Sequence, residues 1–362
     1  MTSRYPFGND PAKIERYKAF WSREAVDRPL VGFSFVGWYP LEYFSACKAW
    51  KVNDHITPEM LEPQQWLDDY ERLLREGEEV QDDMLRGACP IQVAFPCFLP
   101  AILGCKIRVL PDNVLAEELK LPWQEALEKR LDHRNPWFEK CMEFVAALID
   151  RAEGRYPISH GAELGPTDLH AILRGHNESI FDLMDEPEKS AQLLMHLGRV
   201  FAEFFQETWK RLPLYHGGYF DAQYQLWAPG PIIRMQEDAT AVFSPELYRE
   251  LVQPVDRMIA GQFACNFIHL HSTSMGLLDA FLDIDELRCF EINIEPFNIP
   301  VQGMIPYFQM VQDANRPLLI RGSLTEEEAR LVIDSLDPRG LYLHIMLQSQ
   351  EQVDVLRPIL GM

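Results

Sequence analysis

Basic residues are scarce in this sequence relative to acidic ones. The 362 residues include 34 Lys and Arg against 55 Asp and Glu, which gives a formal net charge of −21 at pH 7. No long run of Lys or Arg interrupts this acidic balance. Such a chain repels the phosphate backbone of nucleic acids unless it carries a local basic patch. The composition therefore argues against a nucleic-acid partner.

Long apolar runs and paired cysteines are also lacking. No stretch approaches the roughly 20 consecutive apolar residues that cross a bilayer, and Met1–Asp10 has no apolar signal core. The seven cysteines are scattered without a CxxC pair, which argues against a disulfide framework and against a zinc site made of thiolates alone. We therefore expect a protein of the reducing cytoplasm that makes no membrane contact.

The sequence does contain short β-like runs that alternate with helical segments, the pattern of a parallel sheet with helical crossovers. With 47% hydrophobic residues, it predicts an α/β fold: a single (β/α)₈ TIM barrel over residues 1–362, with an N-terminal helical extension and long loops over the C-terminal face. Eight strands are expected, at Leu30–Val36, Ile107–Leu110, Tyr156–His160, Gly218–Asp221, Asn266–His271, Cys289–Asn293, Pro317–Arg321 and Leu341–Met346. Helices are expected at Thr57–Glu76, Trp137–Glu153, Pro187–Leu212, Pro245–Phe263 and Thr325–Ser335, and a long loop over one end of the barrel at Asp83–Cys105.

In the expected strands of the C-terminal part of the sequence, period-two alternation separates an aliphatic face from a more polar face. In a barrel, one face of every strand packs against helices and the other points into the lumen. The aliphatic faces are therefore expected to meet the helices. The faces expected in the lumen carry Phe267, His269 and His271, then Glu291, Asn293 and Glu295, and finally Tyr342, His344 and Met346.

Polar groups at the ends of several strands are what a barrel active site needs, because that site lies where the strands end. The candidate catalytic residues are His269, His271, Glu291, Asp221 and His344, and the candidate substrate contacts at strand ends are His160, Tyr219 and Arg321. Alternatively, these groups satisfy one another in a polar interior, as Arg321 could with Glu291 or Glu295. Leaving them all unpaired would cost on the order of 1–3 kcal/mol each, which favours a site.

His269-Leu270-His271 is a His-x-His pair on one strand, so both imidazoles point the same way. Both rings can then reach one metal ion, with a carboxylate from a neighbouring strand completing the set. We assign Glu291 to that position, with Glu295 and Asp221 also available. The alternative is a pair of hydrogen-bonded histidines that orient a substrate without a metal.

Several short motifs, in this order, resemble the uroporphyrinogen decarboxylase superfamily, which includes cobalamin-dependent methyltransferases. The matching pieces are Asp27-Arg28-Pro29, Gly165-Pro166-Thr167-Asp168, Glu186-Pro187-Glu188, Phe243-Ser244-Pro245-Glu246-Leu247-Tyr248 with Pro254, and the strand that ends in His269-Leu270-His271. The resemblance runs over most of the chain and is strongest from about Tyr156 to Met275. It implies a TIM barrel.

One departure from the superfamily concerns its decarboxylases. They grip the propionates of their substrate with an Arg-Gln-Ala-Gly-Arg run, whereas this chain has the apolar segment Phe35-Val36-Gly37-Trp38-Tyr39-Pro40 there. Porphyrinogen decarboxylation is therefore disfavoured, since the carboxylates would find no counter-charge. A small, partly aromatic or apolar ligand fits better. Its candidate wall residues, each of which could equally belong to the core, are Trp38, Tyr39, Phe95, Phe98 and Trp227.

A second departure concerns the zinc ligands of the methyltransferases, which are typically His-x-Cys and a later Cys. His269 and His271 take the first two places, and the end of the last strand reads Met346-Leu347-Gln348 without a thiol. A thiolate-rich site that activates a sulfur acceptor is thus not preserved. A harder site of histidine and carboxylate suits the activation of an oxygen or a nitrogen.

The leading hypothesis is a methyltransferase that moves a methyl group from a small methyl ether or amine to a corrinoid protein. A metal, zinc in the first place, or an acid at His269, His271 and Glu291 would assist the leaving heteroatom. The corrinoid would arrive on a partner protein, because we identify no cobalamin-binding domain in the chain; a homodimer is a further expectation. The alternatives are a lyase or decarboxylase that holds a small acid with Arg321, and a non-catalytic ligand-binding barrel.

Overall fold

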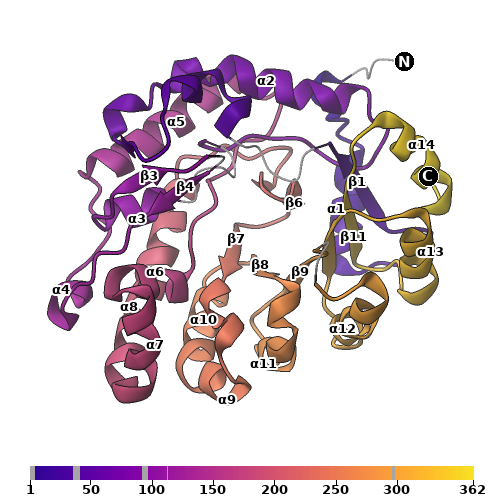
Figure 1. The fold of residues 1–362 in the computed structure, drawn as a ribbon. Helices are drawn as coiled ribbons and strands as arrows, with labels where there is room; N and C mark the ends of the chain where they lie inside the picture. The colour runs from indigo at the N-terminus through magenta and orange to yellow at the C-terminus, as the bar shows by residue number, and fades with distance from the viewer. Residues whose placement is uncertain (1–4, 36–40, 92–96, 112, 296–297) are drawn as a thin grey trace.

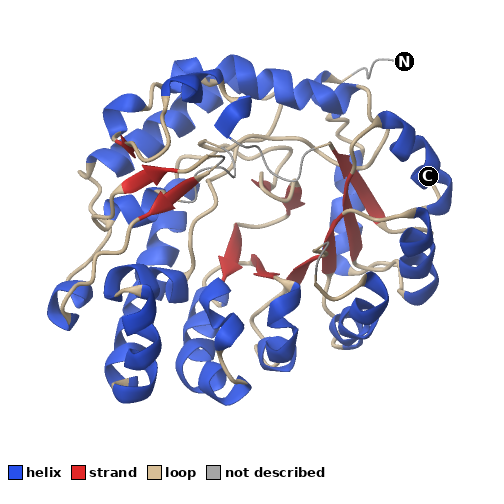
Figure 2. Cartoon of the chain, in the orientation of Figure 1, coloured by secondary structure: helices blue, strands red, loops and turns tan. Residues whose placement is uncertain are grey.

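Six parallel strands form the main sheet of the computed structural model, which describes residues 5–35, 41–91, 97–111, 113–295 and 298–362. Their order in the sheet is β1-β11-β10-β9-β8-β7, and every neighbouring pair is parallel. The sheet curves around the centre of the molecule in Figures 1 and 2. Its strands are β1 Leu30–Ser34, β7 Ile232–Gln236, β8 Cys265–Leu270, β9 Cys289–Asn293, β10 Leu318–Gly322 and β11 Leu341–Met346. The predicted α/β class is confirmed.

Helices α10, α11, α12 and α13 lie on the outer side of this sheet (Figures 1 and 2). The helices of the described residues are α1 Lys13–Ser22, α2 Leu67–Arg75, α3 Phe98–Ile102, α4 Trp123–Leu127, α5 Pro136–Ala152, α6 Pro166–Arg174, α7 His176–Asp185, α8 Pro187–Trp209, α9 Pro245–Leu247, α10 Gln253–Ala260, α11 Leu278–Leu282, α12 Val301–Asp313, α13 Glu326–Ser335 and α14 Gln350–Ile359. Among the described residues, no helix is both long enough and apolar enough to cross a membrane.

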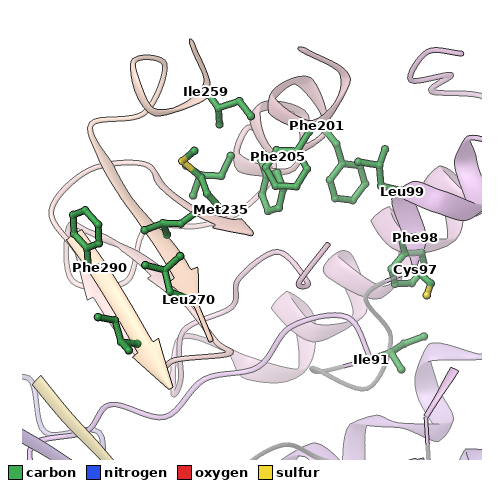
Figure 3. Close-up of a cluster of buried hydrophobic side chains, with 14 of the residues drawn as sticks. Ile91, Cys97, Phe98, Leu99, Phe201, Phe205, Met235, Ile259, Leu270 and Phe290 are labelled. Atoms are coloured by element: carbon green, nitrogen blue, oxygen red, sulfur yellow. The ribbon is translucent and has the colours of Figure 1, made fainter. Parts of the chain in front are cut away.

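The two faces of the late strands have the predicted polarity. Ile268, Leu270 and Phe290 belong to the core shared with the helices, and Figure 3 shows Leu270 and Phe290 in the same apolar cluster as Ile259 of α10. Phe267 lies on the opposite face and belongs to a second, separate core. That second core combines residues of all six main-sheet strands with Ile14, Tyr17 and Phe20 of α1 and with Tyr224, Leu226 and Trp227. The inner face of the sheet is therefore filled by side chains.

Extended chain, without regular strands, lies between the two edge strands β1 and β7. The Asp83 amide donates to the Val31 carbonyl of β1 (2.9 Å), and Ala88 forms a parallel bridge with Ile158. His160 then contacts the Ile232 carbonyl of β7 through Nε2 (3.4 Å). The loop predicted over one end of the barrel was expected to begin at Asp83. This prediction is wrong for residues 83–91. They run beside β1 instead, because Asp82 and Asp83 hydrogen-bond to its backbone.

Three of the eight expected strands are not strands of the parallel sheet. Ile107–Val109 is β3 of a small antiparallel sheet with β2 (His55–Ile56) and β4 (Val114–Ala116). Tyr219–Asp221 is β5 and pairs antiparallel with β6 (Leu226–Ala228), and the 156–160 segment makes only the single bridge at Ile158. Local β propensity indicated extended chain in these places, but pairing partners are decided by tertiary contacts.

Two expected helices are interrupted by turns. The segment 57–76 contains two short 3₁₀ turns, Pro58–Met60 and Pro63–Gln65, before α2, because the ring of Pro63 removes a donor that a continuous helix needs. The segment 245–263 starts at the Ser244 cap, whose Oγ accepts from the Leu247 amide (3.2 Å). It passes through a π turn at Tyr248–Val252 before α10, where Pro254 has no amide proton for a regular helical bond.

Candidate metal centre and its pocket

The two histidines lie at the carboxyl end of β8 with their Nε2 atoms facing each other. The two Nε2 atoms are 3.1 Å apart and the ring planes are inclined by 75°. His269 is buried at 5% exposure, whereas the side chain of His271 is 32% exposed. The pair is therefore reached from solvent on the His271 side.

A carboxylate holds the other ring nitrogen of each histidine. His269 Nδ1 contacts Glu291, its register partner on β9, and the Tyr224 hydroxyl at 2.8 Å. His271 Nδ1 contacts Glu295 Oε1 at 2.6 Å, and the second oxygen of Glu295 accepts from the backbone and the hydroxyl of Ser272. With the Nδ1 atoms engaged in this way, the Nε2 lone pairs are the ones directed toward a common ligand.

Asp238 supplies a third ligand atom on the same side. Asp238, His269 and His271 each offer one possible ligand atom, and these three atoms lie within 4.8 Å of one another. Asp238 Oδ1 is 3.7 Å from His271 Nε2. Asp238 opens the 3₁₀ turn Asp238–Val242 directly after β7. The sequence analysis missed this residue because it did not recognise β7, although the alternation of Ile232, Arg234 and Gln236 with Ile233 and Met235 was a usable signal.

The Gly165-Pro166-Thr167-Asp168 motif holds the Asp238 turn in place. Asp168 Oδ1 accepts from the Ala239 amide (3.1 Å), and the Thr167 amide donates to Glu237 (2.9 Å). Gly165 lies against the end of β7, where an added Cβ would sit 1.5 Å from the Gln236 carbonyl oxygen. The position of Asp238 thus depends on contacts that only a glycine allows.

Two imidazole nitrogens and one carboxylate oxygen form the donor set of a catalytic zinc site with an open position. Carboxylates behind the imidazoles are the usual support of such ligands. The structure corrects the predicted ligand set in one respect, since Glu291 contacts Nδ1 of His269 and Asp238 takes the place predicted for it. The donor set otherwise fits the metal that the histidine spacing suggested.

Charges in the site are unevenly distributed. Asp238 first, and then Glu295, raise the pKa of His271 to about 9 against the cost of burial. Burial, followed by Arg234 and His271, holds the pKa of His269 well below its usual value. Burial raises the pKa of Glu291 to about 8, although Arg321 and Arg234 oppose this shift. A proton between Glu291 and His269 Nδ1 would leave Nε2 of the neutral ring as an acceptor.

A pocket of about 370 Å³ opens beside the three ligand atoms. Its apolar wall consists of Ala162, Leu164 and Met346, and Tyr224 also lines it. The remaining lining residues are polar, and they are Asn113, Gln223, Arg234, Gln236, Asp238, His269, His271, Asn293 and Arg321. The pocket therefore joins a candidate metal centre to a chamber of ligand size that offers both apolar surface and several polar groups.

Of the predicted site residues outside the histidine pair, Arg321 and His344 lie at or next to this pocket. Arg321 lines it, as expected for a substrate contact. His344 is the register neighbour of Arg321 and contacts the Ser34 hydroxyl through Nε2 at 3.0 Å. Burial, then Arg321, lowers the pKa of His344 well below its usual value, so this ring is neutral.

Other predicted site residues do not line the pocket. His160 packs between Phe205 and Trp209, and Tyr219 packs against Trp209. Asp221 is buried and accepts from the Tyr224 amide (2.8 Å), so it supports that loop. Trp227 and Phe98 lie in the two apolar cores. Trp38, Tyr39 and Phe95 lie outside the described residues.

Comparison with known proteins gives one informative result. No protein-family model matches the sequence, and no curated protein matches it. Among solved structures, a methyltransferase from Methanosarcina mazei has a TM-score of 0.61 to this chain, with 13% identity and 99% of each chain covered. At this identity the similarity shows a common fold over essentially the whole length of both chains.

Proposed function

We propose that this chain is a metal-dependent methyltransferase that moves a methyl group from a small methyl ether or amine to the corrinoid of a partner protein. The observation that carries the proposal is the convergence of His269 Nε2, His271 Nε2 and the Asp238 carboxylate beside the pocket. The common fold with a methyltransferase supports methyl transfer in particular. The absence of thiolates from the donor set favours an oxygen or nitrogen substrate over a sulfur one.

The same proposal includes a (β/α)₈ barrel as the scaffold of the whole chain. Six positions are the strands of the main sheet. The segments 83–91 and 156–160 would fill the remaining two, since they connect β1 to β7 through Asp83, Ala88, Ile158 and His160. This places the candidate centre at the carboxyl ends of β7 and β8, where barrel enzymes carry their active sites.

Asp238, His269 and His271 would hold zinc, which as a Lewis acid withdraws charge from the heteroatom that loses the methyl group. Both electrons of the broken carbon–heteroatom bond stay on that heteroatom, and the methyl carbon bonds to the Co(I) corrinoid of the partner. Glu291 and Glu295 keep the two imidazoles oriented and the Nδ1 protons in place. Ala162, Leu164 and Met346 exclude water from one wall of the pocket.

Metal analysis and an activity assay test this function together. Protein purified without chelators should contain about one equivalent of zinc by mass spectrometry. His271→Ala and Asp238→Ala should each lose that zinc, because each removes one of three ligands. His133→Ala is the matched control, since its side chain is 49% exposed and contacts Glu203 and the ring of Phe138, away from the candidate centre.

The activity assay uses free cob(I)alamin as acceptor with panels of methyl ethers and methylamines. Formation of methylcobalamin by the wild type and the His133→Ala variant, but not by His271→Ala, is the expected result. Purified protein that contains no stoichiometric metal, or ligand variants that both retain the metal, would show that these residues do not form a metal centre. Zinc-loaded protein that is silent with every donor would overturn methyl transfer and favour the lyase or ligand-binding alternatives.

Glu295→Gln tests the supporting role of the second carboxylate. The variant keeps all three metal ligands but replaces the charged acceptor of the His271 Nδ1 proton. We expect zinc affinity to fall roughly 10- to 100-fold, measured by competition with a chromogenic chelator. An unchanged affinity would show that the negative charge of Glu295 contributes nothing to zinc binding.

A further inference from the structure

Two arginines on different strands of the main sheet line the pocket. Arg234 comes from β7 and Arg321 from β10, and both line the chamber that adjoins the candidate metal centre. They are 4% and 8% exposed, so both guanidinium groups are almost completely removed from bulk water. Each lies near the ring of Tyr224, with 5.8 Å and 5.4 Å between the guanidinium carbon and the ring centroid.

Neither arginine has a counter-ion in contact. Within the described parts of the chain, no salt bridge or hydrogen bond joins Arg234 or Arg321 to a carboxylate, and Nε of each is buried without a hydrogen-bond partner. The carboxylates nearby are engaged elsewhere, Glu291 with His269 and Glu295 with His271. Since a buried charge without a partner costs several kcal/mol, two such groups in one pocket indicate a ligand that supplies the missing charge.

We propose that Arg234 and Arg321 bind a carboxylate of the substrate. This rests on the proposed function and deepens it, because the methyl donor would then be a methylated carboxylic acid. A carboxylate offers two oxygens to the planar donor fork of arginine, which matches it better than a point charge does. The polar side chains of Gln223, Gln236 and Asn293 line the same chamber and can accept or donate the remaining hydrogen bonds.

The charge of the pocket favours a monoanion. The surface of this protein is strongly acidic, with a formal net charge of −21, so an anionic substrate needs local positive charge to enter. Arg234 and Arg321 supply it, while Asp238, which lines the same chamber, offsets part of it. A dianionic phosphate would be repelled more strongly by the Asp238 carboxylate, whereas a singly charged carboxylate is balanced by the pair of arginines.

The test compares matched acids and amides that differ only in charge. The probes are methoxyacetate, 4-methoxybenzoate and N,N-dimethylglycine, each beside its primary amide, and inorganic phosphate as a separate anion. Binding to the full zinc-loaded chain is measured by isothermal titration calorimetry without any corrinoid. For at least one pair we expect the acid to bind ten times more tightly than its amide, or better, and phosphate to bind more weakly than that acid.

Variants assign this preference to the two arginines. Arg321→Gln and Arg234→Gln should each reduce the acid-to-amide ratio roughly tenfold while leaving amide binding nearly unchanged. Arg321→Lys should recover only part of the ratio, because it restores the charge but not the planar fork. Arg249→Gln is the charge-matched control, since Arg249 is exposed and pairs with Asp283 on the surface. Thermal unfolding of each variant shows whether it is folded.

Three outcomes would overturn the inference: no acid preferred over its amide, a preference that survives in both glutamine variants, or phosphate bound more tightly than every acid. Because the readout is binding, it is independent of methyl transfer. A clear preference for acids together with silence in the methylcobalamin assay would leave the carboxylate site standing and remove only the proposed function.

Discussion

Two pairs of arginines, at the edge of the sheet and in the pocket, differ in whether a carboxylate neutralises their charge. Beside β1, Arg86 and Arg28 make direct ion pairs with Asp82 and Asp83. In the pocket, Arg234 and Arg321 contact no carboxylate among the described residues. Arg86 is as deeply buried as Arg234 and Arg321, so burial alone does not distinguish a structural arginine from one available to a ligand, whereas the presence of a carboxylate partner does.

The ion-paired carboxylates also explain why the segment that contains Asp82 and Asp83 lies next to β1. Asp82 accepts from the Phe33 amide (2.9 Å) and Asp83 from the Val31 amide (3.0 Å), so these carboxylates do for β1 what a neighbouring strand would do. Arg28 holds Asp83 through both nitrogens of its fork. The Asp27-Arg28-Pro29 motif, noted first as a family resemblance, therefore has a local structural role at the edge of the sheet.

The largest effect in this comparison is expected for Asp82→Ala. It leaves Arg86 buried without its carboxylate and removes the acceptor of the Phe33 amide. Removing one partner of a buried pair costs about 3–5 kcal/mol, which we expect as the loss in the free energy of unfolding measured with urea. Asp285→Ala is the control, because that side chain is fully exposed. Equal free energies of unfolding for Asp82→Ala and Asp285→Ala would show that the buried ion pair contributes no more to stability than an exposed aspartate does.

A smaller effect is expected from acid. Burial alone would raise the pKa of Asp82, but the charges of Arg86 and Lys13 outweigh it and hold the pKa below 3.8. A depressed carboxyl pKa stabilises the fold above the unfolded value and loses this contribution as the pH falls toward the folded value. Urea titrations between pH 5 and 2 should therefore show a decline that is shallower in Asp82→Ala. Parallel curves for the two proteins would contradict this.

The smallest loss of stability is expected for the pocket arginines. Arg321→Gln removes a buried charge that has no ion-pair partner and forfeits its contact with the Tyr224 ring. The free energy of unfolding should not fall and should rise, measured by urea denaturation beside Asp82→Ala, because the variant no longer buries an unpaired charge. A loss in the free energy of unfolding as large as that of Asp82→Ala would show that Arg321 is a structural residue, like Arg86.

Much of the late half of the molecule could be predicted from local pattern. Cys289–Asn293 and Leu341–Met346 are strands with the predicted bounds, and the predicted faces separate Ile268 from Phe267 in two different cores. The early half could not be predicted in this way. Residues 83–91 lie beside β1 because Asp82 and Asp83 reach its amides from a distant part of the chain, and no periodicity records such a contact.

By itself, the sequence determined the α/β class, the faces of the late strands and the common direction of His269 and His271. These follow from short-range alternation, which any strand imposes on its own side chains. Only the tertiary structure decided that Asp238 lies beside the two histidines, that Glu291 contacts His269 from behind, and that Arg234 and Arg321 have no counter-ion in contact among the described residues. Those facts depend on which strands are neighbours and on where each loop is anchored, and both are set by contacts between residues far apart in the chain.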